Sequence, residues 1–79
     1  MRDVGAMEVE KVRRGVIRFE RGDNDGAISD FDKTIEFAPK VPMVYYNRGQ
    51  AKEAKGKHGE AITDFKEQYV KDNANVLAA

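Results

Sequence analysis

Apolar side chains recur every three or four residues in four segments of the chain, which is the spacing of an amphipathic α-helix. The segments span residues 8–21, 27–38, 43–55 and 60–72. Turn-forming residues separate the first segment from the second ("GDNDG", 22–26) and the third from the fourth ("GKHG", 56–59). Between the two pairs lies "APKVP", 38–42, where each proline disfavours helical backbone in the residue before it. The pattern predicts an all-α fold of two stacked antiparallel helix-turn-helix hairpins.

The two predicted hairpins have closely related sequences. Seven residues recur unchanged at an offset of 34 positions, namely Arg14, Gly15, Gly22, Ala27, Ile28, Asp30 and Phe31. A fixed period of this length indicates structural repeats that stack on one another. We therefore expect a single domain over residues 1–79, with a first hairpin at 8–39, a second at 42–73 and a short C-terminal tail at 74–79.

With these positions the chain resembles the tetratricopeptide repeat family, whose unit is a helix-turn-helix of about 34 residues. The residues that carry the resemblance are Gly15, Gly22, Ala27, Phe31 and Pro39 in the first unit, and Tyr45, Gly49, Gly56, Ala61 and Phe65 in the second. The resemblance implies that the small residues let the two helices of each hairpin approach closely. A phenylalanine in each unit then fills the space beside them.

Composition narrows the classes of function. The 79 residues include 14 basic and 14 acidic side chains and no cysteine, so neither a disulfide nor a thiolate metal site is available. The zero net charge argues against a protein that coats nucleic acid. The single histidine, His58, lies in a turn and has no second ligand or catalytic partner at useful spacing. We expect a cytoplasmic protein that is not an enzyme, needs no metal or cofactor and does not enter a membrane.

Charge alternates along the chain in register with the predicted helices. Residues 1–21 and 40–58 are net basic, whereas residues 22–39 and 59–79 are net acidic. Two basic triplets recur at helical spacing, Arg14, Arg18 and Arg21 and then Arg48, Lys52 and Lys55. One interpretation is intramolecular, with basic first helices paired to acidic second helices. The other interpretation is that these residues bind an acidic partner. A peptide is favoured over a nucleic acid, because the basic faces offer few aromatic rings for stacking on bases.

The family resemblance also implies a groove, lined by the first helix of each repeat, that holds an extended or helical peptide. The positions that carry over are Val9, Val12, Arg13, Val16 and Phe19 in the first unit, and Met43, Tyr46, Asn47, Gln50 and Glu53 in the second. The first set is mostly an apolar stripe, and such a stripe is usually covered. Candidates for the cover are a bound peptide, the tail "NVLAA", a partner chain, or the hairpin itself if its first helix is rotated.

Two repeats leave one face of the last helix without a neighbour, although repeats of this kind bury their faces against adjacent units. Ile62, Phe65 and Tyr69 lie on that helix and form a candidate self-association surface. The favoured function is a protein–protein interaction or adaptor module that binds a peptide or partner helix in the groove. The alternative is a structural homo-oligomer, a dimer with or without exchanged helices, whose groove is used in self-contact. Nucleic-acid binding through the basic faces ranks last.

Overall fold

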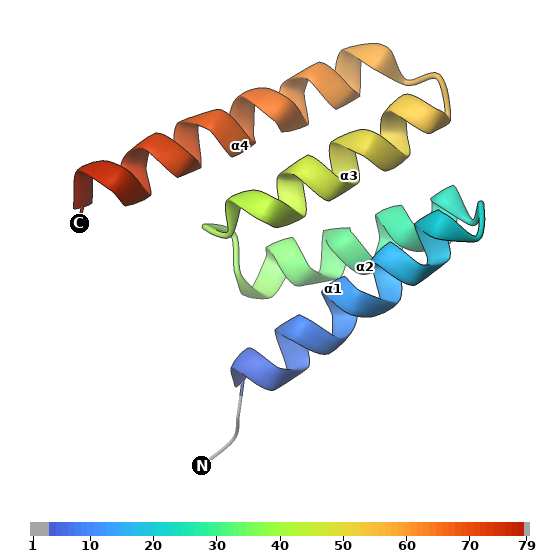
Figure 1. The fold of residues 1–79 in the computed structure, drawn as a ribbon, viewed down its shortest axis with the longest axis horizontal. Coiled ribbons are helices and arrows are strands. Elements are labelled where there is room, and N and C mark those ends of the chain that lie inside the picture. The colour runs from blue at the N-terminus through green and yellow to red at the C-terminus, as the bar shows by residue number, and fades with distance from the viewer. Residues whose placement is uncertain (1–3, 79) are drawn as a thin grey trace.

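The structure, a computed structural model, describes residues 4–78 and the side chains of residues 10–74. It contains the helices α1 (Val4–Glu20), α2 (Asn24–Phe37), α3 (Pro42–Ala54) and α4 (His58–Ala78), and no strand occurs in residues 4–78. Helices α1 and α2 form one antiparallel hairpin, and α3 and α4 form another (Figure 1). The hairpins stack through α2 and α3. The predicted all-α fold of two stacked hairpins is confirmed.

Each hairpin turns at a glycine with left-handed backbone. Gly22 has a φ of 86° and Gly56 a φ of 82°, a region that residues with a Cβ atom rarely adopt. The residue after each glycine donates its N–H to the carbonyl five residues earlier, over 2.8 Å at Asp23 and 2.9 Å at Lys57. This is the Schellman arrangement, which satisfies the last carbonyls of a helix. The repeated sequence therefore builds the same turn twice.

Local signals also fix where two of the helices begin. Asp23 precedes α2, and its side chain accepts a hydrogen bond of 2.9 Å from the Gly26 N–H, which satisfies a donor in the first turn. Pro42 opens α3, at a position where its missing N–H would have had no partner within the helix. The sequence between Pro39 and Pro42 is thereby kept as the connection between hairpins.

Helix α4 is longer than the sequence pattern suggested. The pattern predicts a helix over residues 60–72 followed by a tail at 74–79, but α4 runs from His58 to Ala78. The prediction of a separate tail is therefore wrong for residues 74–78, and Ala79 lies outside the described residues. The physical reason is the absence of a helix breaker. Asn73 stands where the first hairpin has Pro39, and no glycine or proline follows it.

Gly15 and Gly49 lie at points of close contact between the two helices of each hairpin. A Cβ atom at Gly15 would be 2.6 Å from Cε1 of Phe31, and one at Gly49 would be 2.6 Å from Cε1 of Phe65. Non-bonded carbon atoms normally stay more than 3.5 Å apart, so each ring rests against backbone that has no side chain. The close approach predicted for the repeated glycine and phenylalanine is confirmed in both hairpins.

The main core lies between the two hairpins. Ala27 and Phe31 of α2 form one buried cluster with Val44 and Ala51 of α3. Partly buried apolar side chains pack around this cluster, namely Val12, Val16, Phe19, Ile28 and Ile35. Phe31 is completely enclosed, because its ring packs against Gly15 and belongs to the buried cluster that Val44 and Ala51 of α3 complete.

Candidate functional site

A buried aspartate ties together the two helices of the first hairpin. The carboxylate of Asp30 accepts two hydrogen bonds from Arg14, at 2.8 Å from Nη2 and 3.1 Å from Nε. Arg18, one turn further along α1, adds an ion pair at 3.3 Å from its Nη1. Paired bonds between a guanidinium and a carboxylate are strong and directional. Hydrogen bonding and charge from Asp30 raise the pKa of Arg14 above its ordinary value.

The second hairpin repeats this arrangement with a more enclosed set of cations. Asp64 accepts hydrogen bonds from Arg48 at 2.7 Å (Nη2) and 2.9 Å (Nε), and Lys52 Nζ lies 3.3 Å from its Oδ2. Arg48 also reaches the first hairpin, where its Nη1 donates to Asp32 over 2.7 Å. The hydrogen bond to Asp64 is the main cause of a strongly raised pKa for Arg48, which keeps its guanidinium charged.

Most residues of the two basic triplets therefore form ion pairs within the protein. The cations paired to carboxylates of this chain are Arg14, Arg18, Arg48, Lys52 and Lys55. Lys55 crosses between hairpins to Asp25, and Arg21 is exposed near the first turn. The intramolecular interpretation of the triplets is confirmed for these five cations. An acidic partner would have to compete with carboxylates that are already in place.

The first half of the predicted groove is occupied by the protein's own core. Val12, Val16 and Phe19 of α1 are partly buried and pack against the cluster that contains Phe31. Arg13 is exposed, and the side chain of Val9 lies outside the described residues. Of the covers considered for this apolar stripe, packing within the protein accounts for its three described members.

The second half of the predicted groove is more open. Its five positions, Met43, Tyr46, Asn47, Gln50 and Glu53, share one face of α3 by helical spacing. Met43, Tyr46 and Glu53 are exposed, whereas Asn47 and Gln50 are partly buried. The hydroxyl of Tyr46 accepts a hydrogen bond of 2.7 Å from Gln50. The Tyr46 ring lies with its centroid 5.9 Å from that of Phe65 on α4, so this half of the groove adjoins α4.

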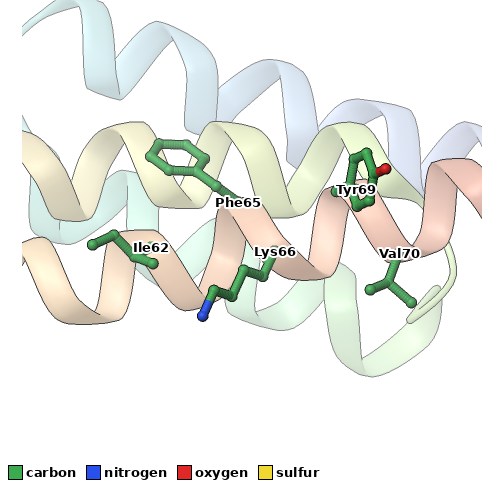
Figure 2. Close-up of a pocket in the computed structure, with 5 residues that line it drawn as sticks. All are labelled: Ile62, Phe65, Lys66, Tyr69 and Val70. Carbon is green, nitrogen blue, oxygen red and sulfur yellow. The ribbon is translucent and has the colours of Figure 1, made fainter.

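An open hollow of about 420 Å³ lies on α4, lined by Ile62, Phe65, Lys66, Tyr69 and Val70 (Figure 2). Ile62, Tyr69 and Val70 are 53%, 67% and 57% exposed, so no described part of the chain covers them. The structure thus brings together all three residues predicted for self-association. Contiguous large exposed apolar side chains are a common feature of interaction sites, whereas the same residues scattered singly are ordinary.

Two residues of the hollow, Lys66 and Val70, were not predicted from the sequence. Figure 2 shows Lys66 between Ile62 and Val70, with Phe65 and Tyr69 along the other edge. The signal that could have found them is helical spacing, since they follow Ile62 by four and eight residues. Lys66 places a charge within this apolar stripe, so apolar periodicity alone does not include it.

The described residues contain no group of three or more histidine, cysteine, aspartate or glutamate side chains that could hold a metal ion. His58 is exposed at the start of α4, with its Nδ1 2.5 Å from Oε1 of Glu53. No described helix has both the length and the apolar character needed to cross a membrane. Comparisons of the chain with protein-family models, curated proteins and solved structures found no match. The surfaces described above are therefore the basis for assigning a function.

Proposed function

We propose that the protein is a non-enzymatic protein-interaction module that binds an amphipathic helix of a partner on the exposed face of α4. One observation carries this proposal. The face of α2 that holds α3 recurs on α4 at the 34-residue offset, and there it is uncovered. The equivalent apolar residues are Ile28, Phe31 and Ile35 on α2, and Ile62, Phe65 and Tyr69 on α4.

The two faces differ in what lies against them. On α2, Phe31 is 0% exposed, and Ile28 and Ile35 are partly buried in the core that α3 completes. On α4, Ile62 and Tyr69 are more than half exposed. Stacked repeats gain stability from interfaces between neighbouring units. A face that has the same spacing and apolar character as the one holding α3 is therefore suited to receive a helix.

Part of the predicted groove adjoins this site. A helix placed on α4 as α3 is placed on α2 would also touch the edge of α3, just as α3 touches α1. Tyr46 occupies that edge, against the ring of Phe65. The proposal therefore uses Tyr46 from the groove, and peptide binding by the remaining groove residues stays a prediction. The repeated glycine turn and the glycine–phenylalanine contact are features that the resemblance to the tetratricopeptide repeat family implies, and the groove of that family is implied to bind proteins.

The α3 segment itself provides a probe for the first prediction. We expect a peptide of residues 40–57 carrying Arg48→Gln to shift amide NMR signals of the full-length protein around Ile62, Lys66 and Val70. The neutral side chain is chosen because α4 lacks the aspartate that Arg48 meets on α2. Ile62→Asp should weaken binding about tenfold, since a charge replaces an apolar contact.

Thr63 is the matched control, because it is exposed and adjacent to Ile62 but does not line the hollow. Thr63→Asp adds the same charge and should leave the affinity nearly unchanged. Signals that stay in place along α4, or equal weakening by the two aspartate variants, would contradict the proposal. Far-ultraviolet circular dichroism of both variants checks that the helices are intact.

A further inference from the structure

The site on α4 differs from its counterpart on α2 in charge. On α2, Asp32 accepts a hydrogen bond of 2.7 Å from Arg48, and Asp25 pairs with Lys55. Both ion pairs cross between the hairpins, the first from α3 to α2 and the second from Lys55, which directly follows α3, to α2. At the 34-residue offset, Lys66 replaces Asp32 and Gly59 replaces Asp25. A helix that docks on α4 as α3 docks on α2 therefore meets a cation where α3 meets an anion.

We infer that the partner helix presents a carboxylate to Lys66, an inference that rests on the function proposed above. The internal interface supplies the pattern of the partner. Val44 and Ala51 of α3 enter the buried cluster with Phe31, and Arg48 lies between them at the charged edge. The partner helix accordingly carries an apolar residue, an acidic residue four positions later and a small apolar residue seven positions after the first.

A second copy of the chain does not fit this requirement. In a head-to-tail stack, α1 of the next copy would take the place of α3, and Arg14 would stand at the position of Arg48. Arg14 would then face Lys66, and no anion on α4 replaces Asp32. A two-fold contact centred on the hollow would instead place the two copies of Lys66 opposite each other. Like charges across an interface oppose binding, so Lys66 acts against both forms of self-association.

Three peptides of residues 40–57 test the inference against the full-length protein: the native sequence, Arg48→Gln and Arg48→Glu. Arginine, glutamine and glutamate have similar helix propensities, so the peptides differ chiefly in charge at one position. We expect affinity for α4 to rise from the native peptide through Arg48→Gln to Arg48→Glu, about tenfold in all. The Lys66→Glu protein should reverse this order, and high salt should reduce the differences.

The outcomes separate this inference from the proposed function. If all three peptides shift the α4 signals with equal affinity, or if Lys66→Glu leaves the order unchanged, the acidic partner is overturned and helix binding stands. If none of the peptides shifts these signals, the proposed function itself fails. Sedimentation of the protein alone should give a monomer at micromolar concentration. A dimer that Ile62→Asp dissociates would instead assign the face to a second copy and overturn the inference.

Discussion

The two hairpins share their internal contacts but differ in what their second helices meet outside the hairpin. Each has a glycine turn with positive φ, a phenylalanine ring against a glycine, and a buried aspartate held by an arginine. The second helix of the first hairpin, α2, packs against α3, whereas the corresponding face of α4 is open. The repeated residues therefore secure each hairpin, and the two hairpins differ in what lies against their second helices.

One pair of contacts shows how equivalent positions can exchange roles. In the first hairpin, Lys11 Nζ lies 4.7 Å from the ring centroid of Phe37. In the second, Lys71 Nζ lies 4.9 Å from the ring centroid of Tyr45. Positions 11 and 45, like 37 and 71, are 34 residues apart, so the cation and the ring have changed helices. Both arrangements join the two helices by a cation–π contact, which no count of identical residues would reveal.

The largest expected difference between the hairpins concerns their phenylalanines. Phe31→Ala should lower the free energy of unfolding by about 4 kcal/mol, because the ring is completely enclosed. Phe65→Ala should cost about half as much, since its ring is only partly buried. Urea unfolding followed by circular dichroism measures both.

A loss of about 4 kcal/mol is close to the whole stability of many domains of this size. If Phe31→Ala does not fold, the milder pair Phe31→Leu and Phe65→Leu makes the same comparison, with the larger loss again expected at Phe31. Equal losses at the two positions would mean that α4 is as well covered as α2. That result would contradict the difference in covering that we describe between the two hairpins.

The sequence predicted those features that depend on local spacing. Helical periodicity, turn residues and the 34-residue offset were enough for the two hairpins and for the glycine contacts of Phe31 and Phe65. The partners of the charged residues could not be predicted in the same way, because spacing alone does not decide whether Arg14 and Arg48 face carboxylates of this chain or of a partner. That choice depends on the rotation of α1 and α3 against their neighbours, which only the packed structure fixes.

The candidate site could be predicted only in part for a related reason. The repeat pattern predicted an uncovered face with Ile62, Phe65 and Tyr69, since the last unit has no described neighbour. Lys66 did not, because a lysine on a helix surface is ordinary unless its counterpart, Asp32, is known to form an ion pair with the next hairpin. The length of α4 was also not predicted, because it depends on the absence of a proline, which lets the helix continue past Asn73.

The buried aspartates should show the next largest difference. Arg48 and Lys52 around Asp64 are 18% and 14% exposed, whereas the cations around Asp30 are 51% and 41% exposed. Without Asp64, the little-exposed Arg48 and Lys52 keep only the exposed carboxylates of Asp32 and Glu60 as partners. Without Asp30, water relieves the cost because Arg14 and Arg18 are more exposed. Asp64→Ala should therefore lower the free energy of unfolding by about 3 kcal/mol, and Asp30→Ala should lower it by clearly less. Thermal unfolding of the two variants at neutral pH compares them, and a larger loss for Asp30→Ala would contradict the difference in burial.

The smallest difference is expected at the two glycines, where two effects of opposite sign compete. Replacing a helical glycine by alanine favours the helix by about 1 kcal/mol, whereas overpacking costs about 1–3 kcal/mol. At Gly15 the new Cβ meets a ring that α3 holds in place, so Gly15→Ala should destabilise by about 1–2 kcal/mol. At Gly49 the ring of Phe65 borders the open hollow and can move, so Gly49→Ala should be nearly neutral.

Binding should remove that tolerance at Gly49. If a partner helix holds Phe65 as α3 holds Phe31, the ring can no longer move away from a Cβ at position 49. Gly49→Ala should then lower the affinity of the protein for the Arg48→Glu peptide several-fold while leaving the free protein as stable as before. NMR titration measures the affinity, and denaturant unfolding measures the stability. An unchanged affinity would show that the occupant of α4 leaves Phe65 free, and that the face of α4 does not bind a helix in the way that α2 binds α3.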